Sequence, residues 1–302
     1  MPEHNSSQNL KEILSRFNFQ FHKGLGQNFL LDGNIIRKII DSANLSDDDV
    51  VVEIGPGAGT LTSVMAKCVR KVIAVELDLK LSPILKKTLD GIDNVELVFE
   101  DALKVDYDNL IRDKCKELPV YSQRSYKVIS NLPYSITTPI LTYLLRKKFS
   151  FSSLILMVQR EVSSRLISVP GSKDYGNLSV VVQYYTVPKV LFMVPRTVFY
   201  PRPEVESAVV LLARRDAPLV KVPEEELFFS LVRGAFGQRR KTILNALSGG
   251  HLISGLNRQQ WKEIIQSVGI DPCRRGETLN LKEFSDICWR CWEYKPLANK
   301  KA

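Results

Sequence analysis

The sequence predicts an α/β fold: a Rossmann-like sheet of seven strands, six parallel and one antiparallel, with a small all-helical domain at the C-terminus. From Val50 to Val158, short β-branched runs alternate with amphipathic stretches, a pattern typical of parallel strands joined by helices. Two further apolar runs follow, with only Pro-rich and turn-like sequence between them. Beyond Pro218 such runs stop and helix-start signals replace them.

Five parallel strands are expected in the alternating region, because five of its runs are rich in β-branched residues and lack internal Gly and Pro. They are Val50–Ile54, Lys71–Glu76, Val95–Phe99, Lys127–Ser130 and Leu154–Val158. The last two strands are expected at Val187–Val194 and Ser207–Leu212. Since no crossover helix fits between these two, they should form an antiparallel edge of the sheet.

The segment from Arg214 to Pro218 marks the expected domain boundary. It gives an N-terminal tail over 1–22, a first domain over 23–216 and a helical domain over 217–302. Helix starts are expected in the last domain where acids follow a proline and where Asn precedes Gln or Glu by three residues. These signals are Pro223 with Glu224–Glu226, Asn257 with Gln260, and Asn280 with Glu283.

The composition narrows the class of protein. With 44% hydrophobic residues the chain can bury a full core, which argues against disorder. It has no apolar run of about 18 residues and no secretory signal at its start, so we expect a cytoplasmic protein without a membrane partner. Residues 217–302 hold 14 Lys and Arg against 9 Asp and Glu, more than half of the net charge of +9. A basic C-terminal segment of this kind favours binding to a polyanion, although a basic surface is often merely solvated.

The five cysteines predict neither a disulfide framework nor a metal site. They are odd in number and scattered, and only Cys288 and Cys291 lie close together. The three histidines do not stand at ligand spacing from that pair. We therefore expect no metal and interpret the two thiols as residues of a terminal helix.

A glycine turn, Glu53–Gly59, follows the first strand directly and leads into a helix from Thr60. Gly55 and Gly57 allow the backbone to approach a ligand closely. A dinucleotide fingerprint would need glycine where Thr60 stands, and Pro56 lacks the N–H that a phosphate nest uses. The turn therefore fits a ligand without phosphates.

Acidic residues end the next two strands, at Glu76 and Asp101. At the carboxyl edge of a parallel sheet, the first carboxylate can accept ribose hydroxyls. The second can accept an adenine amino group. An adenosine-bearing cofactor is therefore expected across the ends of the first three strands.

The fourth strand leads into Asn131-Leu132-Pro133-Tyr134, a tetrapeptide similar to the [DN]-P-P-[FYW] motifs of amino-methylating enzymes. The lone pair of an aromatic amine is delocalised into the ring, so the nitrogen must be held by acceptors as it attacks a methyl group. The side-chain carbonyl of Asn131 and the backbone carbonyl of Pro133 are the expected acceptors. Tyr134 can stack on the base, which contributes about 1 to 3 kcal/mol. A plain turn after a strand is the alternative interpretation.

Together these motifs resemble the KsgA family of small-subunit (16S) ribosomal RNA adenine N6-dimethyltransferases, kin to the Erm methyltransferases. The resemblance covers nearly the whole chain and implies a class I methyltransferase fold with S-adenosylmethionine as cofactor. It implies dimethylation of two adjacent adenosines in the 3′-terminal hairpin loop of 16S rRNA, and a role in small-subunit biogenesis. Besides the turns above, the matching segments are Gly26–Leu30, Phe199–Ser207, Phe236–Asn245 and Arg274–Glu277.

The resemblance also implies roles for single residues. Asn28 and Leu30 would line the methionine end of the cofactor site, above Gly55, and Asn131 would bridge cofactor and target amine. Phe199 would face Tyr134 across the target base, unless it is a core residue beside the sheet. Phosphates of the RNA would be held by Arg239, Arg240, Lys241, Arg274 and Arg275, unless the first three form a solvated helix start.

The expected protein is a monomeric enzyme acting on 16S rRNA in the assembling small subunit. Two alternatives remain open: an Erm-type 23S rRNA adenine N6-methyltransferase, and a non-catalytic RNA-binding assembly factor. A nicotinamide-dependent dehydrogenase is disfavoured by Thr60 and by the absence of a histidine suited to proton relay.

Overall fold

The computed structural model describes residues 12–21, 24, 26–117, 125–249 and 256–294. Its contacts divide the chain into two compact units. The first combines the chain up to Ser163 with Val187–Arg214, and the second combines Ser164–Thr186 with the chain from Arg215 onward.

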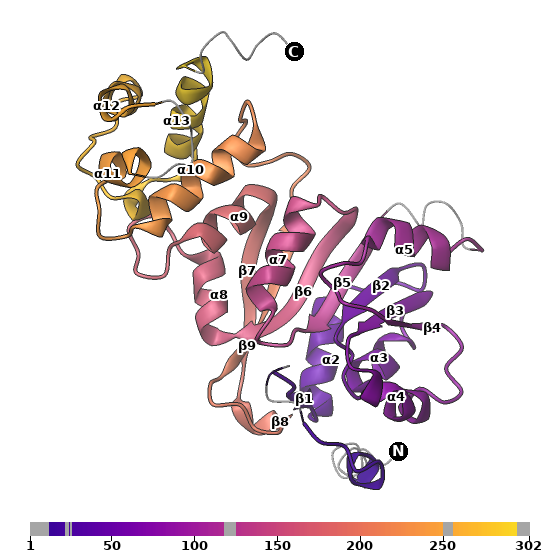
Figure 1. Ribbon diagram of the computed structural model, residues 1–302. Helices are drawn as coiled ribbons and strands as arrows, with labels where there is room; N and C mark the ends of the chain where they lie inside the picture. The colour runs from indigo at the N-terminus through magenta and orange to yellow at the C-terminus, as the bar shows by residue number, and fades with distance from the viewer. Residues whose placement is uncertain (1–11, 22–23, 25, 118–124, 250–255, 295–302) are drawn as a thin grey trace. The chain divides into compact units, whose positions relative to one another are not determined.

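A seven-stranded mixed sheet organises the first unit, which confirms the predicted fold class (Figure 1). Five neighbouring strands pair in parallel, and β9 runs antiparallel to β6. The expected edge pair is also present, because β9 and β7 are neighbours and β7 is the outer strand. In spatial order the strands are β4 (Val95–Phe99), β3 (Lys71–Glu76), β2 (Val50–Ile54), β5 (Tyr126–Asn131), β6 (Phe151–Gln159), β9 (Ser207–Arg214) and β7 (Thr186–Val194).

The strand order reverses at β2, which has β3 on one side and β5 on the other. Ligands of open α/β sheets bind beyond the carboxyl ends of the strands at such a reversal. All five residues of β2 are buried, so the strand that enters the turn at Gly55 is fixed by packing on both faces.

Helices of the first unit pack on the sheet through their apolar residues. Ile36 and Ile39 of α2 lie in one core cluster with Leu61 and Met65 of α3 and with buried residues of eight strands, six of them in the main sheet. Helices that begin in this unit include α2 (Gly33–Ser42), α3 (Thr60–Met65), α4 (Ser82–Thr88), α5 (Tyr107–Lys114), α7 (Thr137–Arg146) and α8 (Arg160–Ile167), with the 3-10 helices η2 (Leu79–Leu81) and η3 (Arg196–Val198).

A second, two-stranded sheet was not predicted. β1 (Phe29–Leu30) pairs antiparallel with β8 (Phe199–Tyr200), and Leu31 N–H donates to the Val198 carbonyl at 2.9 Å. Strands of two residues carry no readable alternation of apolar and polar residues. Their pairing brings the segment before β2 beside the segment between β7 and β9.

The second unit is helical, and its three predicted helix starts are confirmed. Glu225 and Glu226 lie in the first turn of α10. Asn257 forms a capping box with Gln260, and Asn280 exchanges two hydrogen bonds with Glu283. Its helices are α9 (Asn177–Tyr185), α10 (Glu225–Gly237), α11 (Ile243–Ser248), α12 (Arg258–Ser267) and α13 (Leu281–Tyr294), with the 3-10 helix η4 (Gly276–Thr278).

One segment of this unit, Ser164–Thr186, falls within the range that the sequence analysis gave to the first domain. The physical reason is aromatic packing. The ring of Tyr184 in α9 lies 5.2 Å from the rings of both Phe228 and Phe229 in α10. Tyr184 is also fully buried, so α9 packs as part of the helical unit although it lies between two strands in the sequence.

No helix within the described ranges is long and apolar enough to cross a membrane. Cys288 and Cys291 are buried in α13, as the sequence predicts for residues of a terminal helix.

Candidate cofactor and target-base site

A cavity of about 200 Å³ opens at the carboxyl ends of β2, β3, β4 and β5. It is walled by the glycine turn after β2, by the turn after β5 and by β1 with the residues before it. Nine of the ten residues predicted to bind cofactor or target base line it: Asn28, Leu30, Gly55, Gly57, Glu76, Asp101, Asn131, Pro133 and Tyr134.

The glycine turn requires glycine for both conformation and space. Gly55 and Gly57 have φ of +71° and +58°, in the left-handed region that other residues rarely adopt. A Cβ atom at Gly57 would lie 2.8 Å from the Phe29 ring, and one at Gly55 would lie 3.2 Å from Pro133. The backbone therefore forms the cavity floor directly.

The Glu76 carboxylate is held by three backbone N–H groups. Its Oε1 accepts from Leu77 and Asp78, both at 2.9 Å, and its Oε2 accepts from Gly57 at 3.2 Å. Burial raises the pKa of Glu76, and these hydrogen bonds oppose that rise. A carboxylate offers about four acceptor positions, so one position on Oε2 remains for a ligand hydroxyl.

At the other end of the cavity, Asp101 accepts a hydrogen bond from Leu103 N–H at 3.0 Å through Oδ1. Its Oδ2 lies 3.8 Å from the Lys104 ammonium. Leu30 is 2% exposed, and its carbonyl accepts from the Thr60 hydroxyl at 3.1 Å, which joins β1 to the start of α3.

Glu53 is a cavity residue that the sequence analysis did not single out. It is 1% exposed, and the Thr62 hydroxyl bonds to its Oε2. Burial, with a smaller contribution from the charge of Glu76, raises the pKa of Glu53 to about 8. Glu53 is therefore mostly protonated at neutral pH. The signal was its position as the sole acid within an apolar strand that ends at the glycine turn.

We expect the wild type to lose stability relative to a Glu53→Gln variant as the pH rises from about 5 to about 8. The folded state keeps the Glu53 proton up to about pH 8, whereas the unfolded chain releases it above about 4.5. Rising pH therefore favours unfolding, by on the order of 1.4 kcal/mol per pH unit in this window. Urea unfolding of both proteins at several pH values measures the difference. A difference independent of pH would contradict the assignment.

The side chain of Asn131 is oriented by Asn28, the residue that precedes β1. Its Nδ2 donates to the Asn28 carbonyl at 2.9 Å, and Asn28 Nδ2 in turn donates to the Gly26 carbonyl at 3.1 Å. Because the amide nitrogen of Asn131 is engaged, its Oδ1 is the atom left to accept a hydrogen bond from a ligand.

The Pro133 carbonyl was expected to accept a hydrogen bond from the target amine, but in the structure it is already occupied. It already accepts hydrogen bonds from Ile136 N–H at 3.2 Å and from the Thr137 hydroxyl at 3.1 Å, which occupy both of its lone pairs. The carbonyl of Leu132, one residue earlier in the same turn, accepts none from the described residues. Leu132 also lines the cavity.

Phe199 is the predicted site residue that the structure places elsewhere. It is 3% exposed and packs in the core cluster with residues of α2 and α3. The register of the small sheet sets it opposite Leu30, so Phe199 matches the alternative interpretation of a core residue. The exposed neighbour is Tyr200, whose ring lies 5.3 Å from that of Phe21.

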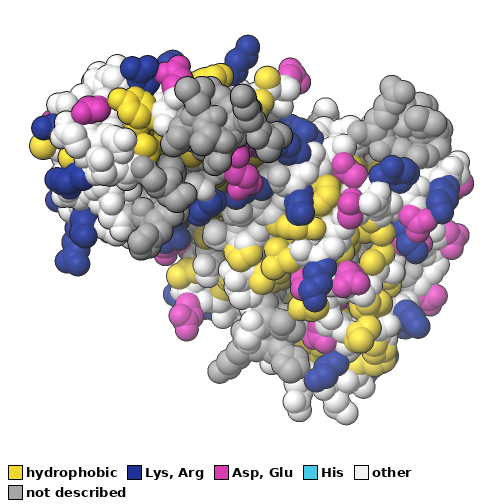
Figure 2. All heavy atoms as spheres, turned by 45° about the horizontal axis from the view of Figure 1, so that its top comes forward, with side chains coloured by type: hydrophobic (Ala, Val, Ile, Leu, Met, Phe, Trp, Pro, Cys, Tyr) yellow, Lys and Arg dark blue, Asp and Glu magenta, His cyan; other side chains and the backbone are white. Residues whose placement is uncertain are grey.

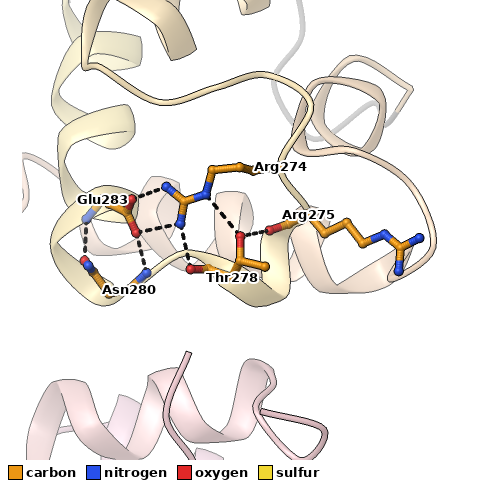
Figure 3. A network of polar contacts seen from close by, with 5 residues as sticks. All are labelled: Arg274, Arg275, Thr278, Asn280 and Glu283. Atoms are coloured by element: carbon orange, nitrogen blue, oxygen red, sulfur yellow. Dashed lines mark hydrogen bonds and ion pairs between the residues drawn. The ribbon is translucent and has the colours of Figure 1, made fainter. Parts of the chain in front are cut away.

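Two of the five arginines and lysines predicted to hold RNA are tied into the helical unit. Arg239 donates to the carbonyls of Lys173 and Tyr175 and lies 3.4 Å from the Glu277 carboxylate. Arg274 pairs with Glu283 and donates to the Thr278 carbonyl at 2.7 Å (Figure 3). Both guanidinium groups therefore hold loops together.

The other three cations are exposed and have no ion-pair partner among the described residues: Arg240, Lys241 and Arg275. An isolated antiparallel β-bridge between Thr242 and Arg275 places the loop of Arg240 and Lys241 beside the loop of Arg275. The Arg275 guanidinium points away from the Arg274 network (Figure 3). On the face drawn in Figure 2, Lys and Arg side chains lie mixed with Asp and Glu. Of the five predicted RNA-binding residues, these three are therefore the candidates left for phosphate contacts.

Comparisons with known proteins agree on one kind of enzyme. The profile of the family described as ribosomal RNA adenine dimethylase matches residues 18–286. A protein of Pelotomaculum thermopropionicum named ribosomal RNA small subunit methyltransferase A is 52% identical over 278 residues, 92% of this chain and 94% of its own length. A Moorella thermoacetica protein of the same name is 54% identical over 269 residues, 88% of this chain and 90% of its own.

Solved structures show the same fold. A dimethyladenosine transferase from Plasmodium falciparum superposes with a TM-score of 0.69 at 23% identity, covering 86% of this chain and 95% of its own. The 23S rRNA methyltransferase ErmE superposes with a TM-score of 0.61 at 25% identity, covering 87% of this chain and 98% of its own.

Proposed function

The chain belongs to the ribosomal RNA adenine dimethylase family, and we propose that it dimethylates N6 of two adjacent adenosines in the 3′-terminal hairpin loop of 16S rRNA. It is an S-adenosylmethionine-dependent methyltransferase. The observation that carries the proposal is the Asn131–Tyr134 turn at the same cavity as Glu76 and Asp101.

The cavity fits the cofactor in shape and chemistry. Glycines at 55 and 57 leave the floor free of side chains, and Oε2 of Glu76 keeps one acceptor position for a ribose hydroxyl. Asp101 accepts a hydrogen bond from the adenine amino group, and the chain around Asn28 and Leu30 lines the methionine end of the site. When bound, S-adenosylmethionine would supply a methyl group on a positively charged sulfur, and its loss would leave a neutral thioether, an excellent leaving group.

The target adenine enters at the turn after β5. Asn131 Oδ1 and, in place of the Pro133 carbonyl, the Leu132 carbonyl accept hydrogen bonds from its exocyclic amine. These two acceptors favour a pyramidal nitrogen, while the Tyr134 ring stacks on the base. Alignment of the amine with the methyl group then supplies most of the catalysis. The N–C bond forms as the S–C bond breaks, and the cationic nitrogen then releases its proton to water, so no general base is required.

The partner is 16S rRNA in the assembling small subunit, on which the protein acts as a monomer in the cytoplasm. Extrusion of an adenine costs least in a loop, which suits a hairpin-loop substrate. Relatives about 50% identical over more than nine-tenths of the chain carry the small-subunit name. ErmE, which acts on 23S rRNA, is 25% identical, so the Erm-type alternative is disfavoured. The complete Asn131–Tyr134 turn disfavours a non-catalytic assembly factor.

Incubation with labelled S-adenosylmethionine and small subunits that lack the modification should label two adjacent adenosines of 16S rRNA. Mass spectrometry of the digested RNA should find N6-dimethyladenosine at both positions. Fully modified subunits are the control and should accept no methyl group. A parallel reaction with 23S rRNA tests the alternative, and labelling of 23S rRNA but not of 16S rRNA would establish an Erm-type enzyme.

A further inference from the structure

The hydroxyl group of Tyr134 has a partner in a distant part of the sequence. Its oxygen lies 2.6 Å from the Oγ of Ser207, 73 residues further along the chain. This is a short and well-formed O–H···O hydrogen bond. Tyr134 itself lines the cavity, so a contact to its hydroxyl acts on the ring that meets the target base.

Ser207 is a rigid anchor. It is fully buried and begins β9, where it lies opposite Gln159 in the antiparallel pairing with β6. Just before it, the Glu206 carbonyl accepts from Arg160 N–H at 3.0 Å, and the side chains of Arg160 and Glu206 form an ion pair. The position of the Ser207 hydroxyl is thus set by the sheet.

The backbone end of Tyr134 is fixed separately. Thr137 and Ile136 both donate to the Pro133 carbonyl, which closes the turn against the start of α7. Tyr134 is therefore held at its backbone by this turn and at its hydroxyl by Ser207. Because the side chain is held at both ends, its ring can rotate less than a ring held at one end only.

We propose that Ser207 is a positioning residue for methyl transfer, which sets the orientation of the Tyr134 ring against which the target adenine stacks. The inference rests on the proposed function. Stacking tolerates small rotations of the ring, whereas transfer requires the amine nitrogen within about 3 to 3.5 Å of the methyl carbon and in line with it. Burial raises the pKa of Tyr134, so its hydroxyl stays protonated and the hydrogen bond persists at neutral pH.

A double-mutant cycle of Ser207→Ala and Tyr134→Phe tests the proposal in single-turnover methylation assays. Each variant removes one side of the same hydrogen bond, and Tyr134→Phe keeps the ring for stacking. Each should lower the transfer rate about fivefold, the factor expected for one ordinary hydrogen bond, and leave the KM for the subunit nearly unchanged. The double variant should be no slower than either single variant.

Ser163→Ala is the matched control, because Ser163 is also a buried serine, 3% exposed, whose hydroxyl donates to the Arg160 carbonyl at 2.7 Å and contacts no predicted site residue among those described. It should transfer methyl groups at the wild-type rate, and thermal unfolding should find all variants folded at the assay temperature. Three results would overturn the role of Ser207 and leave the proposed function standing. Ser207→Ala could be as fast as wild type, it could be slower only through KM, or it could slow transfer further in the Tyr134→Phe background. An inactive wild type would overturn the proposed function and the assignment with it.

Discussion

Replacing Asn131 with alanine is expected to lower the rate of methyl transfer by about 100-fold or more and to leave RNA affinity nearly unchanged. In the proposed site Asn131 Oδ1 accepts from the amine, because Nδ2 of the same side chain already donates to the Asn28 carbonyl at 2.9 Å. As the amine attacks, positive charge develops on its nitrogen and strengthens the hydrogen bond to this oxygen. An interaction that grows in the transition state contributes to the rate and not to ground-state affinity.

Single-turnover assays at saturating S-adenosylmethionine measure the transfer rate, and filter binding measures the affinity for the subunit. Asn109→Ala is a suitable control, because Asn109 is an exposed asparagine of α5 outside the cavity lining. It should react like the wild type. Near-normal transfer by Asn131→Ala would show that the amine is held by other groups.

The main sheet could be predicted because parallel strands are buried on both faces and therefore have apolar runs that the sequence shows directly. The predicted ends of β6 were less accurate, since Phe151–Ser153 mixes one aromatic with two serines and yet pairs with β5 and β9. The placement of α9 could not be predicted at all. It depends on ring contacts between Tyr184 and Phe228, residues 44 apart, and no local pattern encodes them.

Some features of the site could likewise be predicted from the sequence, and others could not. Gly55, Gly57 and Asn131 could be predicted because each stands at the end of a strand, where chain direction alone delivers it to the cavity. The sequence does not show hydrogen bonds that occupy an atom before any ligand arrives. The Pro133 carbonyl is occupied by Thr137 in this way, and the Arg274 guanidinium by Glu283. Predictions based on residue type treat such groups as free.

Replacing Arg240, Lys241 and Arg275 together with glutamine is expected to weaken binding to the small subunit by about tenfold to 100-fold at low salt. The plot of log affinity against log salt should lose roughly 2 to 3 in slope, because each phosphate contact contributes about 0.7 to 0.9. These three side chains are exposed and, among the described residues, without an ion-pair partner, so a phosphate need not displace a carboxylate to reach them.

Arg274→Gln is the matched comparison, because it removes one positive charge from the same loop. Its guanidinium is already neutralised by Glu283, and its contacts to Thr278 hold the turn before α13 (Figure 3). Its loss should destabilise the protein by about 2 kcal/mol, as for hydrogen bonds to a charged group, and leave the salt slope unchanged. Equal loss of slope per charge in the two variants would mean that RNA competes successfully for Arg274. The distinction between ion-paired and unpaired cations would then fail for Arg274, which would belong to the same binding surface as the other three.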